Sequence, residues 1–146
     1  SVGGGGLISG TVGYLKSVQP SMTSVGCSPQ NDHAMFASIQ AGKIVDGDAR
    51  PTLSDGSAGG VEPGAITFEL CQKLVDQWVL VSEVEIADAM RLFIENEHQL
   101  LEGAAGSAIA GFLNRASVAP SEFAGKNVVI IICGARISLS ALKSIL

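Results

Sequence analysis

The residues best suited to chemistry in this sequence stand at its beginning. The run Gly3-Gly4-Gly5-Gly6-Leu7-Ile8-Ser9-Gly10 leads directly into a segment of helical character. Glycines let successive backbone N–H groups turn toward a ligand, and a helix N-terminus adds a partial positive charge. Together these features predict a cradle for an anion, best suited to a phosphate. A flexible linker is the alternative, and four glycines alone are equally typical of it.

Two familiar phosphate-binding motifs do not fit this loop. The dinucleotide fingerprint needs glycines at positions i, i+2 and i+5, and no register between Gly3 and Gly10 supplies all three. A P-loop ends in Gly-Lys-Ser/Thr, whereas Gly10 is followed by Thr11 and Val12. The loop therefore belongs to neither class of nucleotide-binding loop.

A second feature joins an apolar run to a glycine turn near the end of the chain. The run from Asn127 to Cys133 is apolar after its first residue and mostly β-branched, which is typical of a strand buried in a parallel sheet. Such a strand would deliver the Cys133 thiol, followed by Gly134, to the ligand-binding edge of the sheet. A buried structural cysteine is the alternative, and it is the commoner role of an isolated cysteine.

Two further segments place a carboxylate beside a glycine. Ser54-Asp55-Gly56 lies in a long loop from Asp46 to Gly64, and loops of that length inside a compact domain are often functional. Glu102-Gly103-Ala104-Ala105-Gly106 interrupts a helix and precedes small residues that let backbones pack closely. The alternatives are an ordinary Asp-Gly turn and a carboxylate that caps a helix.

Several classes of function find no support. The net charge of −5 and the pI near 4.8 argue against nucleic-acid binding, which requires a basic face. The longest strictly apolar run, Val128 to Cys133, is too short to cross a bilayer, so no membrane partner is expected. His33 and His98 lack metal-ligand spacing, so no metal site is predicted. The absence of a Gly-x-Ser-x-Gly elbow argues against a serine hydrolase.

The size and the cysteine content indicate one ordinary domain in a reducing compartment. With 146 residues, of which 47% are hydrophobic, the chain can bury a sizeable core. Its three cysteines form no Cys-x-x-Cys pair and are an odd number, so we expect free thiols and a cytoplasmic location.

The expected secondary structure alternates between helices and strands. Ser82 and Glu85 form a capping box that opens a helix with Val84 and Met90 on its apolar face. Other helices are expected at 7–18, 34–41, 65–75 and 139–146, and strands at 22–27, 78–81 and 127–133. This alternation predicts an α/β fold with a parallel or mostly parallel sheet flanked by helices.

Taken in order, these features resemble the threonine dehydratase and serine racemase branch of the fold type II pyridoxal-phosphate enzymes. Each matching segment is weak alone, but the ordered set is specific and spans essentially the whole chain. The segments are the run from Gly3 to Gly10, Gly26-Cys27-Ser28-Pro29, Ala37 to Lys43, Pro51 to Gly56, Thr67 to Leu70, Glu102 to Ala105, and Cys133-Gly134-Ala135. The resemblance implies the large-domain architecture of a fold type II enzyme, which is like that of tryptophan synthase β.

The resemblance also implies a cofactor, pyridoxal 5′-phosphate, and the residues that bind it. The family's tetraglycine loop grips the cofactor phosphate through backbone N–H groups and corresponds to Gly3, Gly4, Gly5, Gly6 and Leu7. The residue that opens the family's last glycine turn, here residues 133–136, faces the pyridine nitrogen and corresponds to Cys133. The segments expected to flank the ring correspond to Asp55, Gly56 and Glu102.

The chain departs from the family pattern at two places. Arg136 stands where the family often has asparagine, which leaves any contact from that position unassigned. Ser28 precedes Pro29, whereas the divalent-metal site of serine racemase uses a glutamate before that proline. The expected set of bound groups therefore contains no metal of that type.

The catalytic lysine of the family has no counterpart in this sequence. In the family it lies well upstream of the glycine loop, and none of Lys16, Lys43, Lys73, Lys126 and Lys143 has its sequence context. We therefore expect residues 1–146 to be a single-domain fragment of a longer polypeptide, with no catalytic residue of its own and no activity alone. Its expected partners are the missing N-terminal part of the enzyme, further copies in a homo-oligomer, and a small amino acid substrate.

The activity that the resemblance implies is deamination of a hydroxy amino acid such as threonine or serine, by β-elimination of water. A neutral thiol at the pyridine nitrogen would moderate the electron sink and suit that elimination. Three alternatives stay open: an amino acid racemase, a lyase for hydroxyaspartate or a diamino acid, and a catalytically dead binding domain.

Overall fold

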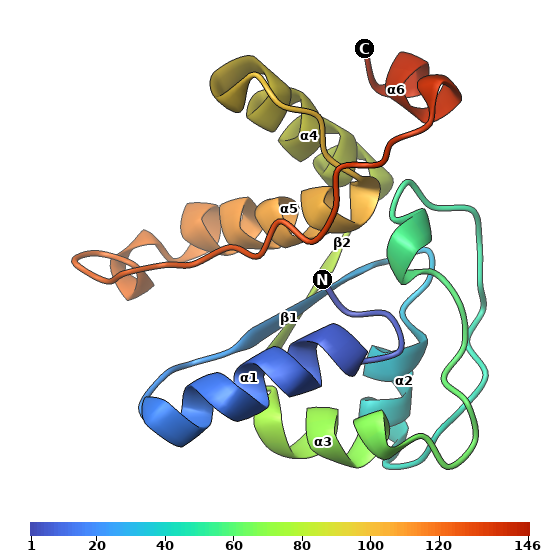
Figure 1. Cartoon of the computed structure of the whole chain (residues 1–146), viewed down its shortest axis with the longest axis vertical. Coiled ribbons are helices and arrows are strands. Elements are labelled where there is room, and N and C mark those ends of the chain that lie inside the picture. Colours follow the sequence, from blue (N-terminus) through green and yellow to red (C-terminus); the bar gives the residue numbers. More distant parts are fainter.

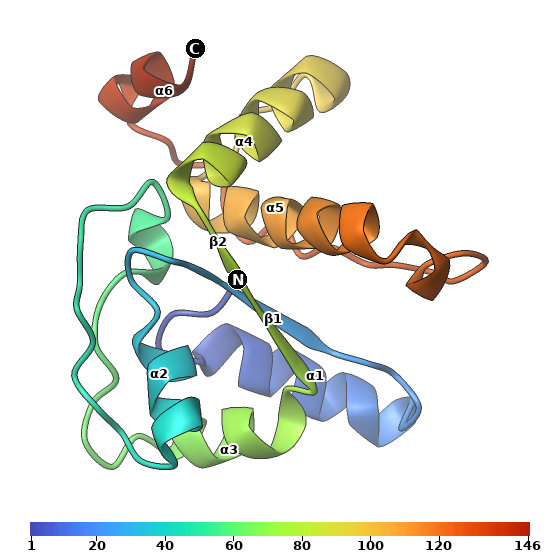
Figure 2. The same ribbon diagram turned by 180° about the vertical axis from the view of Figure 1, so that it is seen from behind.

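The computed structural model describes every residue from Ser1 to Leu146. Two strands lie between two groups of helices, with α1, α2 and α3 on one side and α4 and α5 on the other (Figures 1 and 2). In chain order the elements are α1 (Gly6–Val18), β1 (Val25–Pro29), α2 (Ala34–Ala41), the 3-10 helix η1 (Asp55–Ser57), α3 (Ile66–Leu74), β2 (Gln77–Val81), α4 (Glu83–Glu97), α5 (Gly103–Val118), the 3-10 helix η2 (Pro120–Glu122) and α6 (Leu139–Ile145). The predicted α/β architecture is confirmed.

The two strands form a parallel pair at the centre of the molecule. β1 pairs with β2 from Val25 opposite Gln77 to Pro29 opposite Val81. Burial along β1 is continuous from Gly26 to Pro29 rather than alternating, because helices cover both faces of the sheet. β1 begins three residues later than the sequence predicted and includes Pro29, which was expected to follow it.

The capping box predicted at the start of α4 is present. The hydroxyl of Ser82 accepts a hydrogen bond from the N–H of Glu85, and the N–H of Ser82 donates to the Glu85 carboxylate at 2.7 Å. The hydrogen bond from the Ser82 backbone is the largest of the contributions that hold the pKa of Glu85 below its ordinary value. The predicted apolar face is shifted, however: Val84 is 68% exposed, and the buried face of α4 consists of Ile86, Ala89 and Met90.

The hydrophobic core consists of two clusters, one on each side of the strands. The cluster on the α4 and α5 side contains Val81, Ile86, Ala89, Met90, Leu101, Ala105, Ile109, Ala110 and Ile145. The cluster on the α1, α2 and α3 side contains Val2, Ala34, Met35, Val61, Cys71 and Val75. The sheet therefore separates two hydrophobic layers, as an α/β sandwich requires. None of the helices combines the length and the apolar character that a bilayer span needs.

The segment from Asn127 to Cys133 is not a strand, contrary to the sequence prediction. It is extended and runs alongside α5 (Figures 1 and 2), but it forms no backbone hydrogen bond with β1 or β2. Val129 is 81% exposed, and Val128, Ile131 and Ile132 are each more than 40% exposed. A β-strand needs a neighbouring backbone to complete its ladder, and no other strand lies beside this segment.

The start of α5 is packed against the chain before η1. A Cβ atom added to Gly103 would clash with the carbonyl oxygen of Leu53. The obstructing atom belongs to the backbone, so it cannot move aside as the end of a flexible side chain could. The small residues after Glu102, which the sequence linked to close packing, permit this approach, and every residue from Gly103 to Gly111 is buried.

We therefore expect Gly103→Ala to destabilise the protein by at least about 2 kcal/mol, because α5 must shift away from Leu53. Gly10→Ala is the matched control, since an added Cβ there meets no atom within 4 Å. The control should instead gain about 0.5–1 kcal/mol from the helix propensity of alanine. Urea denaturation followed by circular dichroism measures both changes. Equal stability of Gly103→Ala and the wild type would contradict the packing.

Candidate functional site

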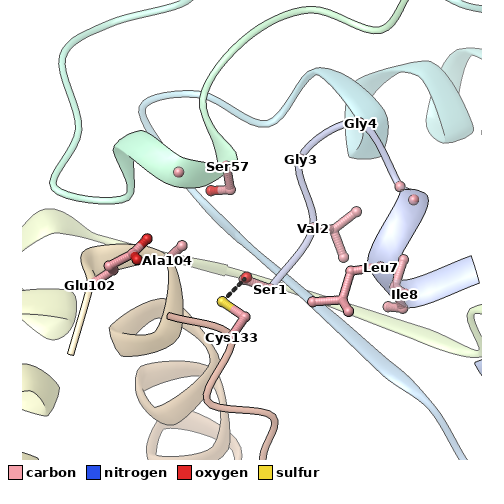
Figure 3. A pocket seen from close by; sticks show the side chains of 13 residues that line it. Ser1, Val2, Gly3, Gly4, Leu7, Ile8, Ser57, Glu102, Ala104 and Cys133 are labelled. Carbon is pink, nitrogen blue, oxygen red and sulfur yellow. Dashed lines mark hydrogen bonds between the residues drawn. The ribbon is translucent and has the colours of Figure 1, made fainter. Parts of the chain in front are cut away.

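A cavity of about 290 Å³ lies where segments distant in the sequence meet. Figure 3 shows the glycine loop and the start of α5 bordering it from opposite sides, with Ser57 between them. Its lining consists of Ser1, Val2, Gly3, Gly4, Gly5, Gly6, Leu7, Ile8, Gly56, Ser57, Glu102, Ala104 and Cys133. The fold thus brings together the glycine loop, Gly56, Glu102 and Cys133, all of which the sequence singled out.

The glycine loop enters the cavity from a fixed backbone position. Val2, which is buried, donates its N–H to the carbonyl oxygen of Cys27 at 2.8 Å and accepts the hydroxyl of Ser28 at 3.0 Å. Three residues later Gly5 has φ +83°, a left-handed conformation that favours glycine. A Cβ atom on Gly5 would also lie 2.7 Å from the Cys71 sulfur. These two constraints explain why position 5 is a glycine.

The loop leaves a row of backbone donors without partners in the chain. α1 begins at Gly6, and the first intrahelical acceptor is Gly5, whose carbonyl oxygen receives the N–H of Ser9 at 3.0 Å. The N–H groups of the six residues 3–8 donate no hydrogen bond within the chain. All six residues line the cavity. Unpaired donors at a helix N-terminus form a site for an anion, and the dipole of α1 adds to the attraction.

No side chain supplies positive charge to the cavity. None of its lining residues is a lysine or an arginine, and Glu102 is the one carboxylate among them. An anion bound here would therefore depend on hydrogen bonds from N–H groups. The phosphate cradle that the resemblance assigned to residues 3–7 fits this geometry, and the free N–H of Ile8 extends the cradle by one residue.

The 3-10 helix η1 contributes two residues to the cavity, but Asp55 is not one of them. Asp55 is exposed, and its carboxylate accepts the N–H of its neighbour Gly56 at 2.9 Å. Gly56 and Ser57 line the cavity. Ser57 is buried, and its hydroxyl lies 2.6 Å from that of Ser54. Ser57 was not predicted from the sequence, since no motif marks a serine that a tertiary contact with Gly3 brings to the site.

Glu102 and Cys133 border the same cavity from the other side. Glu102 occupies the N-cap position of α5, but its side chain makes no capping hydrogen bond to the helix. The Cys133 sulfur lies 3.5 Å from the hydroxyl of Ser1 (Figure 3). Cys133 is exposed, whereas Cys27 and Cys71 are buried. Of the three thiols, Cys133 is therefore the one that can meet a ligand in the cavity.

The residues present fit pyridoxal 5′-phosphate on two independent grounds. The free N–H groups of residues 3–8 match the acceptors of a phosphate ester. The Cys133 thiol, as a weak neutral donor and acceptor, can contact a pyridine nitrogen without charging it. The described residues contain no group of three or more metal-ligating side chains suited to an ion.

Comparison with known proteins places this geometry in a family. Residues 1–134 match the family model described as pyridoxal-phosphate dependent enzyme. The chain is 39% identical over 145 residues to the L-threonine ammonia-lyase of Thermotoga maritima, covering 99% of the chain and 35% of that protein. The chain thus spans about a third of the length of that curated relative.

Solved structures agree with the sequence matches. The structure of maize serine racemase superposes with a TM-score of 0.85 at 27% identity, covering 98% of this chain and 43% of that one. The processed form of threonine deaminase isoform 2 from Solanum lycopersicum superposes with a TM-score of 0.83 at 32% identity, covering 99% of this chain and 41% of that one. The large-domain fold expected from the resemblance is confirmed.

The accessibility of the three thiols provides a direct test of the site. Burial raises the pKa of Cys27 and raises the pKa of Cys71 to about 11, so both stay protonated and shielded at neutral pH. We expect one thiol to react with Ellman's reagent at least about tenfold faster than the other two in the folded protein. Cys133→Ser should abolish that fast phase. Two fast thiols, or a fast phase that survives the substitution, would contradict the placement of Cys133.

Proposed function

The chain belongs to the pyridoxal-phosphate dependent enzyme family, and from that premise we propose that it forms the phosphate-binding part of an enzyme that deaminates a hydroxy amino acid such as threonine or serine. The observation that carries the proposal is the row of free N–H groups at residues 3–8, which shares one cavity with the Cys133 thiol. The names of two similar proteins, L-threonine ammonia-lyase and threonine deaminase, support the reaction class.

The proposed roles of this chain are to bind and orient the cofactor. Pyridoxal phosphate, when bound, supplies an electron sink for the bonds at the substrate's α-carbon. The N–H groups of Gly3, Gly4, Gly5, Gly6 and Leu7 would hold its phosphate, and Gly5 keeps the loop open by its left-handed backbone. The thiol of Cys133 would contact the pyridine nitrogen without holding it protonated, which suits elimination of a β-hydroxyl.

The proposal assigns the covalent attachment of the cofactor to residues outside this chain. None of the five lysines lines the cavity, and Lys16 donates to the Asp76 carboxylate and to the carbonyl oxygen of Leu74. None of these lysines is therefore placed to form the Schiff base or to move the α-proton. We infer that the chain alone binds the cofactor through its phosphate and does not turn over substrate.

Racemisation is the second candidate, because the fold of maize serine racemase superposes so closely. Racemisation returns the α-proton to the same carbon, whereas deamination expels the β-hydroxyl and gives a keto acid and ammonia. The two reactions therefore differ in products that one assay can separate.

The anion cradle is tested by Gly4→Asp against Gly4→Asn. A Cβ on Gly4 meets no atom within 4 Å, so both side chains fit and differ mainly in charge. A carboxylate about 4 Å from a phosphate costs roughly 1 kcal/mol per charge pair even in water, so Asp should weaken binding at least about tenfold relative to Asn. Isothermal titration calorimetry with pyridoxal 5′-phosphate measures both affinities, and equal affinities would refute the cradle.

The reaction is tested by joining this chain to the lysine-bearing region of a threonine dehydratase. The joined protein should release keto acid and ammonia from L-threonine or L-serine, and its Gly4→Asp variant should be strongly impaired. Formation of D-serine without keto acid would favour the racemase. A joined protein that binds the cofactor and yields neither product would reject the proposed function.

A further inference from the structure

We propose that Glu102 is a positioning residue that clasps the turn of residues 133–136 and thereby holds the Cys133 thiol at the cavity. The catalytic meaning of this inference rests on the proposed function, but the clasp is a property of the chain itself. Sequence resemblance placed Glu102 beside the cofactor ring, whereas the geometry points to an action through Cys133.

Glu102 fastens the turn at two points. Its backbone N–H donates to the carbonyl oxygen of Gly134 at 3.0 Å, and its Oε1 accepts the N–H of Arg136 at 3.0 Å. The two hydrogen bonds run in opposite directions and bracket Ala135. A residue that bonds a turn with both its backbone and its side chain fixes the position and the orientation of that turn.

These two hydrogen bonds are the only ones made by the backbone of residues 127–137. The segment forms no ladder with the sheet. Its other attachments to the protein are the packing of Ile130 and Ile137 against the core and the 3.5 Å contact of the Cys133 sulfur with the Ser1 hydroxyl. Removal of the Glu102 contacts would leave eleven residues without a single backbone tie. Cys133, at the start of the turn, is the residue of this segment that lines the cavity.

The Glu102 carboxylate occupies the space that a side chain at position 134 would need. A Cβ atom on Gly134 would lie 2.5 Å from Cδ of Glu102 and 2.8 Å from its Oε2. The backbone of Gly134 does not have positive φ. Glycine is therefore needed here because a side chain would not fit beside the carboxylate, and not because of the backbone conformation. The carboxylate therefore packs directly against the turn. Because the obstructing atoms belong to a flexible side chain, Gly134→Ala would push the carboxylate away rather than break the backbone.

Glu102 is itself held from the opposite side. The next residue, Gly103, abuts the carbonyl oxygen of Leu53, and Oε2 of Glu102 lies 3.2 Å from the position of a Cβ on Gly56. Glu102 thus links the η1 side of the cavity to the thiol side. No hydrogen bond joins Glu102 to the glycine loop, so loss of the clasp should spare the phosphate cradle.

The test uses three variants of the full chain and one control. Glu102→Ala removes the acceptor for Arg136, and Gly134→Ala displaces the same carboxylate without altering Glu102. Glu102→Gln keeps an acceptor oxygen and should rescue the clasp. Glu97→Ala removes an exposed carboxylate at the end of α4 and serves as the control.

The first measurement is amide hydrogen exchange of Arg136 by nuclear magnetic resonance, which requires no cofactor. Protection should fall about tenfold in Glu102→Ala and in Gly134→Ala, and it should be unchanged in Glu102→Gln and in the control. Equal protection in Glu102→Ala and the wild type would overturn the clasp.

The second measurement compares the affinities for pyridoxal 5′-phosphate and for inorganic phosphate. Glu102→Ala should weaken pyridoxal phosphate several-fold and leave inorganic phosphate unchanged, because the thiol moves and the loop does not. Parallel loss of both ligands, or loss of neither, would overturn the positioning role. If the wild type binds neither ligand, the proposed function fails, and the exchange result still decides whether the clasp exists.

Discussion

The central constraint on this structure is that the backbone N–H groups of residues 3–8 have no hydrogen-bond acceptor within the chain. A buried unpaired donor costs on the order of 1–3 kcal/mol, so such a row persists only where water or an anion can reach it. Residues 3–8 meet this condition at the mouth of the cavity. The buried residue Val2, the left-handed Gly5 and the sulfur of Cys71 hold the row in place from behind. The rest of the fold serves to bring a second wall opposite this row.

The wall of the cavity opposite the glycine loop consists of residues that tertiary contacts bring together from distant parts of the sequence. β1 and β2 separate the helix layers, and α5 crosses the sheet so that Glu102, at its start, faces the glycine loop across the cavity. The close approach of Gly103 to the carbonyl of Leu53 sets how near η1 comes to this wall. The glycine loop, η1 and the start of α5, which lie about 45 or more residues apart in the sequence, therefore fix one cavity.

The features that the sequence predicts correctly depend on local signals, and those that it predicts wrongly depend on a distant neighbour. The capping box of Ser82 and Glu85, the glycine loop and the alternation of helices and strands depend on residues a few positions apart, and the structure contains all three. The run from Asn127 to Cys133 has the composition of a strand, but no other strand lies beside it, so it is extended and exposed. The composition of a segment indicates its β-strand propensity, but a strand also needs the backbone of a neighbouring strand for its hydrogen bonds.

The same distinction applies within the site. Gly3 to Leu7, Gly56, Glu102 and Cys133 could be singled out because motifs or glycines mark them, whereas Ser57 reaches the cavity only through a contact with Gly3. Asp55 was singled out by its motif, yet its carboxylate turns back to the N–H of Gly56 and leaves the cavity to its neighbours. An Asp-Gly pair reads the same in sequence whether the carboxylate closes a turn or meets a ligand.

The absence of basic side chains from the lining explains which positions matter for anion binding. A cradle built from lysine or arginine could be lost by truncating one side chain, but N–H groups are present in every residue except proline. What can be lost is the backbone shape that aims them, and in this chain that shape depends on glycines. Backbone donors also carry only partial charge, so a dianion bound here would keep most of its own charge. The Cys133 thiol on the opposite wall adds neither a fixed positive nor a fixed negative charge to the cavity, so it does not change the charge that a bound dianion keeps.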